Sequence, residues 1–303
     1  MKNILITGSS GFIAPHIIEA GIRDNFKVTG IDLNDPNEED IVKGCEYIKK
    51  DVRDLTVDEL SKFDYIIHLA WVTNIPFTIA NPVSSTDNNI TMTTILMDNA
   101  TKAKIKKFIF SSTASLYGNN PLPWKENMKS DAIEPYSWQK LSCENLCKMW
   151  SERYDLKTGV LRLFQVYGEN QRKDTALSAF IKAKISNQPI TLTETTAQSA
   201  FRTGRRDFIY VKDVANAFLA ALRSEKVSKG EIINVGTGIM TTMEDIAKTI
   251  GGEIKFIPRR SFEVEAHQAD LSNGKKLIEW QPKVKVLDWL KNFVEDQTNR
   301  GLE

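Results

Sequence analysis

The sequence predicts an α/β fold in which one parallel sheet is covered by helices on both faces. Two observations support this fold class. Short apolar runs, typical of buried strands, alternate with helical patterns through the first half of the chain. A turn that contains two glycines joins the first of these runs to the first helical pattern. Strands that alternate with helices form parallel sheets, because each helix carries the chain back to the same edge.

The expected strands follow one another in order. We expect them at residues 3–7, 27–31, 46–49, 64–69, 107–111 and 158–163. Beyond residue 163 the alternation becomes less regular, so we predict a Rossmann-type doubly wound domain over residues 1–163. Residues 164–303 are expected to form a smaller, interleaved α/β region that closes over the first domain and binds the substrate. The run 207–211 is interpreted as a strand that returns to the first domain.

The first strand and the turn after it predict a dinucleotide site. Ile4, Leu5 and Ile6 form the apolar strand, and Gly8 allows the tight turn that follows it. Gly11 lets backbone N–H groups approach a pyrophosphate at the positive end of the helix, and Ala14 takes the third small position of the motif.

The second strand ends at Asp32, which lies where such folds place an acid that binds the adenosine ribose, about 20 residues beyond the glycines. A carboxylate there would repel the additional phosphate of NADP, and the residues that follow Asp32 are Leu33, Asn34 and Asp35 rather than arginine. The predicted cofactor is therefore NAD, bound by residues 1–163.

A tyrosine and a lysine predict proton transfer beside that cofactor. Pro135 favours a helix start, which puts Tyr136 and Lys140 one turn apart on the same face. We expect the ammonium group, together with the positive nicotinamide ring, to lower the pKa of the phenol, so that Tyr136 can act as a base. The strand at 107–111 leads into hydroxyl residues that end at Thr113, on the edge of the sheet where ligands bind.

The composition excludes several other classes of function. The net charge is +1, which gives no indication of nucleic acid or a membrane surface as a partner. No apolar run reaches the length of about 18 residues that a membrane span needs. The three cysteines, Cys45, Cys143 and Cys147, have no metal-binding spacing and leave an odd thiol. We therefore expect a cytoplasmic protein without a metal site.

Taken together, the motifs resemble those of the extended short-chain dehydrogenase/reductases, and within them the nucleotide-sugar epimerase/dehydratase family. The resemblance covers nearly the whole chain. The segments that carry it are 7–14, Asp32, 51–52, 68–70, 87–89, 111–113, Tyr136 with Lys140, 206–211, 269–270 and 280–282.

The resemblance implies roles for individual residues. The residues implied to contact NAD are Gly8, Gly11, Phe12 and Ile13 at the pyrophosphate, Asp32 at the ribose, Asp51 and Val52 at the adenine, and Leu69, Ala70 and Asn89 along the cofactor path. The catalytic residues implied are Thr113 at the reacting sugar hydroxyl, Tyr136 as base, and Lys140 at the nicotinamide ribose. The substrate residues implied are Arg206 and Arg260 at the diphosphate, Gln165 where the family has asparagine, and His267 at a position that sets sugar size and favours non-acetylated sugars.

Three further departures from the family pattern lie in the substrate half. Glu169 replaces a proline, the segment 193–205 replaces a shorter glycine-rich loop, and 261–263 replaces a glycine–aspartate pair. These changes predict an unusual sugar beside an unchanged cofactor site.

The resemblance is strongest to the UDP-glucose (UDP-galactose) 4-epimerases. Dehydratases of the family carry an acidic pair directly after the hydroxyl residue, whereas Thr113 is followed by Ala114 and Ser115. The prediction is an NAD-dependent 4-epimerase of a nucleotide-diphosphate sugar, with a UDP-sugar favoured. A 4,6-dehydratase or 4-reductase and a non-catalytic NAD-binding sensor or scaffold remain as alternatives. Apolar residues on helical patterns 90–103 and 141–154 predict a homodimer joined by a four-helix bundle.

Overall fold

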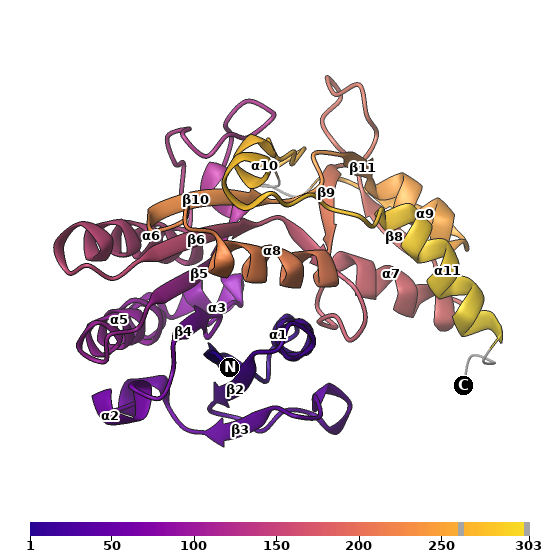
Figure 1. Ribbon diagram of the computed structural model, residues 1–303. Coiled ribbons are helices and arrows are strands. Elements are labelled where there is room, and N and C mark those ends of the chain that lie inside the picture. Colours follow the sequence, from indigo (N-terminus) through magenta and orange to yellow (C-terminus); the bar gives the residue numbers. More distant parts are fainter. Residues whose placement is uncertain (260–263, 300–303) are drawn as a thin grey trace.

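The computed structural model describes residues 1–259 and 264–299. Seven parallel strands form its central sheet in the order β10-β6-β5-β4-β1-β2-β3 (Figure 1). Their bounds are β1 Asn3–Thr7, β2 Lys27–Asp32, β3 Glu46–Lys49, β4 Tyr65–His68, β5 Lys107–Thr113, β6 Thr158–Leu163 and β10 Lys229–Val235. The predicted fold class and the six predicted strands of the first half are confirmed.

Both faces of the sheet are covered by helices, so its strands are apolar throughout. Ile4 and Ile6 of β1 pack with α1 (Ala14–Arg23) and α8 (Val211–Arg223), whereas Leu5 between them packs with α5 (Met92–Lys102). Successive side chains of a strand point to opposite faces, which explains why an uninterrupted apolar run is required here. The helix α6 (Pro135–Arg153) lies beside α5, and α10 (Ser272–Ile278) lies on the α8 side (Figure 1).

The short elements of the first half lie in the loops between strands. They are η1 Glu38–Asp40, η2 Val52–Asp54, α2 Val57–Leu60, α3 Ile75–Ala80, α4 Pro82–Thr86, the π-helical turn η3 Asp87–Thr91, and η4 Ala114–Tyr117. Within the described ranges, no helix is both long and apolar enough to cross a membrane.

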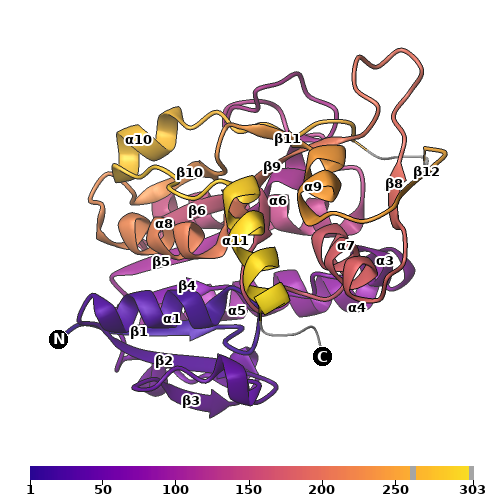
Figure 2. The same cartoon turned by 90° about the vertical axis from the view of Figure 1, so that its right-hand side faces the viewer.

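A second region with its own apolar core lies beside the C-terminal ends of the strands (Figure 2). Its elements are β7 Gln165–Tyr167, α7 Ala176–Ile185, β8 Ile190–Thr193, β9 Arg205–Tyr210, β11 Met240–Thr242, α9 Met243–Ile250, β12 Ile254–Ile257 and α11 Val286–Asn299. The strands form a three-stranded sheet, β11-β9-β7, and a two-stranded sheet, β12-β8.

The strand expected at 207–211 exists as β9, but it does not join the seven-stranded sheet. It pairs with β7 and β11. Asp207 at its third position is fully buried and accepts backbone hydrogen bonds from Thr237, Gly238 and Ala269. A buried carboxylate needs such donors. The strand that does return is β10, which pairs with β6 at the edge of the large sheet.

The strand order reverses at β1, since β2 lies on one side of it and β4 on the other. In open α/β sheets, ligands bind in the crevice that such a reversal leaves at the carboxyl ends of the strands.

Candidate active site

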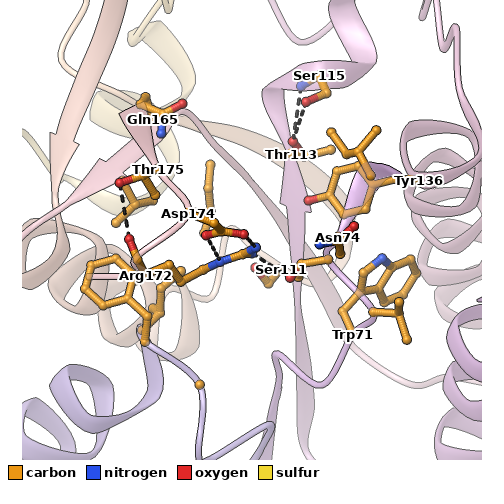
Figure 3. Close-up of a pocket in the computed structure, with 18 of the residues that line it drawn as sticks. Trp71, Asn74, Ser111, Thr113, Ser115, Tyr136, Gln165, Arg172, Asp174 and Thr175 are labelled. Atoms are coloured by element: carbon orange, nitrogen blue, oxygen red, sulfur yellow. Dashed lines mark hydrogen bonds and ion pairs between the residues drawn. The ribbon is translucent and has the colours of Figure 1, made fainter. Parts of the chain in front are cut away.

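A cavity of about 1430 Å³ occupies this crevice and extends into the second region (Figure 3). Most of the residues predicted from the sequence line it. They are Gly8, Gly11, Phe12, Ile13, Asp32, Asp51, Val52, Leu69, Ala70, Asn89, Thr113, Tyr136, Lys140, Gln165 and Arg206. Arg260 lies outside the described residues.

The turn after β1 has the shape that a dinucleotide requires. Gly8 has φ of 74°, and a Cβ atom there would come within 2.6 Å of the backbone nitrogen of Ala70. Only glycine fits this conformation and this close approach without strain. The helix α1 begins after Ile13, whose side chain gives no capping hydrogen bond. Gly11, Phe12, Ile13 and Ala14 at this helix start line the cavity, where backbone N–H groups could bind the pyrophosphate of NAD.

Asp32 is held in place at the end of β2. Its carboxylate accepts hydrogen bonds from the backbone N–H groups of Ser10 and Asn34, each at 3.1 Å. A carboxylate offers about four acceptor positions, so capacity remains for two ribose hydroxyls. Lys50 lines the same end of the cavity, but its ammonium group is paired with Glu59 at 2.8 Å. The residues around the cavity therefore fit NAD better than NADP.

Two other residues of the cofactor half are bound tightly by protein groups. Both nitrogens Nε and Nη2 of Arg53 bind the carboxylate of Asp51, which lowers the pKa of that carboxyl. The amide of Asn89 is buried, accepts the N–H of Val72 at 2.8 Å and donates to Gln139 at 2.8 Å. Asn89 thus fixes the loop after β4 along the cavity wall.

Tyr136 and Thr113 meet at the boundary of the two regions. The carboxylate of Glu134 caps α6 by accepting the N–H groups of Tyr136 and Ser137 at 2.7 and 2.8 Å. This cap fixes the helix start, and Tyr136 lines the cavity together with Thr113 at the end of β5 (Figure 3). Burial raises the pKa of Tyr136 to about 12, and the nearby Thr113 hydroxyl opposes that rise.

Lys140 does not act on Tyr136 as we expected. Its Nζ donates to the carbonyl oxygen of Ser111 at 2.6 Å and lies 3.8 Å from the ring centre of Trp71. Burial lowers the pKa of Lys140 to about 7, so the ammonium is only partly populated at neutral pH. Lys140 is not among the groups that shift the pKa of Tyr136, because its ammonium points to Ser111 and Trp71 instead.

A buried ion pair, not predicted from the sequence, holds α6 against the sheet. Glu144, one turn after Lys140, accepts from Nε and Nη2 of Arg162 at 2.9 and 2.7 Å and from the Ser112 hydroxyl at 2.5 Å. This network joins α6, β5 and β6 directly beneath Thr113 and Lys140. The residues of this network lie far apart in the chain, so no local sequence motif predicts that they interact.

The substrate half contains another charged group that the sequence did not reveal. Nη1 of Arg172 donates to the Thr73 hydroxyl at 2.6 Å, and its Nε and Nη2 bind the carboxylate of Asp174 at 2.9 and 2.5 Å (Figure 3). Arg172 therefore joins the loop after β7 to the loop after β4. Gln165 stands at the start of β7, and Nη1 of Arg206 donates to the carbonyl oxygens of Arg205 and Glu265.

His267 does not line the cavity, and the structure does not support it as a gate for the sugar. Its ring packs against Trp124, with ring centres 5.0 Å apart. Burial, together with the charge of Arg206, lowers the pKa of His267 to about 3, so the ring is neutral.

Comparison with known proteins is consistent with this geometry. The model of the NAD dependent epimerase/dehydratase family matches residues 4–236. The chain belongs to this family. Its members include the putative UDP-glucose 4-epimerase of Methanocaldococcus jannaschii, which is 32% identical over 95% of this chain and 98% of its own length. The UDP-glucuronate 4-epimerase of Thermodesulfobacterium geofontis is 30% identical over 97% of this chain and 95% of its own length.

A solved structure extends the likeness to three dimensions. The UDP-N-acetylglucosamine 4-epimerase from Methanobrevibacter ruminantium, in complex with UDP-N-acetylmuramic acid, superposes with a TM-score of 0.88 at 30% identity. The match covers 99% of both chains. The substrate half of the fold is therefore shared along with the Rossmann half.

Proposed function

We propose that this protein is an NAD-dependent 4-epimerase of a nucleotide-diphosphate sugar, with a UDP-sugar as substrate. The observation that carries the proposal is that Tyr136, Thr113 and Lys140 together line one cavity with the dinucleotide turn. These groups line the cavity between the dinucleotide turn and the second region. Residues 1–163 would bind the cofactor, and residues 164–303 would mainly bind the sugar nucleotide.

The protein's own groups account for the proton transfer. Thr113 donates a hydrogen bond to the oxygen on carbon 4 of the sugar. Tyr136 takes the proton from that oxygen as its phenolate, the form that the positive nicotinamide ring of bound NAD would favour. NAD, when bound, supplies the acceptor for hydride from carbon 4 and the donor that returns it to the opposite face. The Tyr136 phenol, now protonated, returns its proton to the oxygen after the sugar has turned. Arg206 would bind the diphosphate and retain the ketone intermediate meanwhile.

The acids of the cavity favour epimerisation over dehydration. Of the described residues that line it, the carboxylates are Asp32, Asp51 and Asp174. The first two lie at the adenosine end, and both oxygens of Asp174 are bound by Arg172. Removing water from carbons 5 and 6 of the sugar needs a free acid and a base near them, and neither is provided by these carboxylates.

The direct test is proton NMR of the purified protein with NAD and UDP-glucose or, separately, UDP-galactose. Each sugar is expected to convert to the same mixture of the two without net formation of NADH. In a Tyr136→Phe variant turnover should fall by about 100-fold or more. Tyr154→Phe is the matched control, because Tyr154 caps the other end of α6 and does not line the cavity. Retention of more than about a tenth of turnover by Tyr136→Phe would refute the base assignment.

If neither UDP-hexose is converted, the same assay is extended to uronate and N-acetylated UDP-sugars. Bound NAD without turnover on any of these would instead support the binding-protein alternative. If the wild type converts one of these UDP-sugars, that result identifies the class of sugar. The roles of Tyr136 and Thr113 are then tested with the substrate so found, by comparing the variants with the wild type.

We propose in addition that the protein is a homodimer in which α5 and α6 pack against their copies. Support comes from apolar side chains that remain exposed at the edge of this helix pair. Val83 of α4 is 83% exposed and Trp138 of α6 is 52% exposed, and α4 packs beside α6. Sedimentation at micromolar concentration should give twice the chain mass, and Trp138→Lys should shift the mass toward the monomer. A wild-type monomer would overturn the proposal.

The cellular compartment is proposed to be the reducing cytoplasm. Cys45, Cys143 and Cys147 are all free thiols, and burial raises the pKa of both Cys143 and Cys147. Such thiols persist where disulfides are not formed.

A further inference from the structure

Trp71 lies in the loop after β4 and lines the cavity beside Asn74 and Tyr136 (Figure 3). Its indole ring packs edge-on against Phe110, with ring centres 5.6 Å apart at 63°. Its face is turned to Lys140, whose Nζ lies 3.8 Å from the ring centre. This is well within the distance of about 6 Å at which an ammonium group is attracted to an aromatic face.

Among the described residues, no carboxylate forms an ion pair or hydrogen bond with the ammonium group of Lys140. Its one hydrogen bond among the described residues is to the carbonyl oxygen of Ser111, and the Phe110 ring lies 4.8 Å away on another side. The carboxylate of Glu144 is bound by Arg162 and Ser112 instead. The charged form of Lys140 is therefore stabilised mainly by a carbonyl and two aromatic faces.

The other titratable groups around Lys140 carry no charge that would replace this contact. From β4, His68 is neutral because burial lowers its pKa to about 3. On α6, burial raises the pKa of Cys143 to about 12 and that of Cys147 well above its usual value, so both thiols are protonated. Tyr136 is a phenol at neutral pH.

The indole N–H of Trp71 does not fix the ring. Nε1 is buried, and within residues 1–259 and 264–299 it has no hydrogen-bond partner. A buried donor is usually paired, so an unpaired one indicates that something else selects this position of the ring. The contacts that remain are packing against Phe110 and the face contact with the ammonium group.

We propose that Trp71 is a positioning residue, which holds Lys140 in its charged form and directs it toward the cofactor ribose. The inference rests on the role proposed above for Lys140. An ammonium group has three N–H bonds. Ser111 accepts one of them, the Trp71 and Phe110 rings cover two sides, and Lys140 itself lines the cavity. By covering one side, Trp71 also keeps water away from the ammonium.

The test compares three substitutions in the NAD-saturated protein. Trp71→Leu and Trp71→Met fill space without an aromatic face, whereas Trp71→Phe keeps a face and removes the indole N–H. Trp150→Phe is the matched control, since Trp150 is a buried tryptophan of α6 that does not line the cavity. The pKa of Lys140 is measured by NMR of protein with isotope-labelled lysine side chains, its signal assigned through Lys140→Met.

Trp71→Leu and Trp71→Met are expected to lower the pKa of Lys140 by about 0.4–1.5 units. Trp71→Phe should recover half or more of that shift, and Trp150→Phe should leave the pKa unchanged. The alkaline limb of the pH dependence of kcat should move down with the Lys140 pKa in each variant.

An unchanged Lys140 pKa in both aliphatic variants would overturn the proposal, even if kcat fell. The proposal would also be overturned if Trp71→Phe lowered the pKa of Lys140 as much as Trp71→Leu and Trp71→Met do, because the aromatic face would then have no effect. The NMR measurement does not depend on turnover. A wild-type protein without epimerase activity would therefore refute the proposed function without deciding the role of Trp71.

Discussion

Glu144→Gln tests how much the buried ion pair between Glu144 and Arg162 contributes to the free energy of unfolding. Both side chains, Glu144 and Arg162, are only 2% exposed. The substitution keeps the shape of Glu144 and removes its charge, so the guanidinium of Arg162 remains as an uncompensated buried cation. Nη1 of Arg162 already has no hydrogen-bond partner among the described residues, and the guanidinium lies 4.8 Å from the ring centre of Tyr117.

Breaking one side of such a pair typically costs about 3–5 kcal/mol of unfolding free energy. With about 2–4 °C of melting temperature per kcal/mol for a large domain, the midpoint should fall by about 6–20 °C. The assay is thermal unfolding followed by circular dichroism, with urea unfolding as the second measurement. Asp98→Asn is the control, because Asp98 forms an exposed pair with Lys102 at 2.6 Å and should change stability by less than about 0.5 kcal/mol.

A double variant shows whether the loss of stability comes from an unpaired buried charge or from replacing the side chains themselves. Glu144→Leu combined with Arg162→Met removes both charges, and apolar replacements of buried pairs are often neutral. We expect it to be more stable than Glu144→Gln. If Glu144→Gln lies within about 1 kcal/mol of the wild type, the site is better solvated than its geometry implies and the reasoning fails.

Three substitutions in the cavity test the cofactor and catalytic assignments. Gly8→Ala places a Cβ atom 2.6 Å from the backbone nitrogen of Ala70, so NAD affinity should fall by about tenfold or more in calorimetric titration. Asp32→Ala removes the acceptor for the ribose hydroxyls. It should lower the ratio of NAD to NADP affinity by about tenfold in a competition titration. Thr113→Val keeps the shape and loses the hydroxyl, so kcat should fall by about 10–100-fold with NAD affinity unchanged. Unchanged kinetics in Thr113→Val would remove Thr113 from the mechanism.

The residues that could be predicted are those whose role follows from their place on one element. Gly8 and Asp32 follow the ends of β1 and β2, and Tyr136 begins a helix, so local pattern was enough to place each of them. The register of the large sheet then brings the ends of those elements to one crevice. The same logic placed Thr113 at the end of β5.

The residues that were missed have partners from remote parts of the chain. Arg172 bonds to Thr73, 99 residues away, and Trp71 meets Lys140 only because β4, β5 and α6 pack side by side. His267 was misplaced for the same reason, since the tertiary packing of Trp124 takes its ring out of the cavity lining. Sequence position predicts where a backbone runs, but side-chain direction here depends on packing between distant elements.

Lys140→Met should abolish turnover and, at the same time, increase the stability of the folded protein at low pH. Burial lowers the pKa of Lys140 from 10.5 to about 7, so the folded state disfavours the ammonium that the unfolded chain carries. The cost is therefore full below pH 7, shrinks as the pH rises from 7 to 10.5, and vanishes above 10.5.

A shift of this size corresponds to at most about 5 kcal/mol, and the contact with Trp71 and the lost bond to Ser111 both reduce the net gain. We expect Lys140→Met to be about 1–3 kcal/mol more stable than the wild type at pH 6 and no more stable at pH 10.5. Urea unfolding at the two pH values measures the difference, and NMR assay of the same protein should show turnover lost. A variant less stable than the wild type at pH 6 would mean that the aromatic faces and the Ser111 carbonyl fully compensate the buried charge. Lys140 would then support the fold as well as the chemistry.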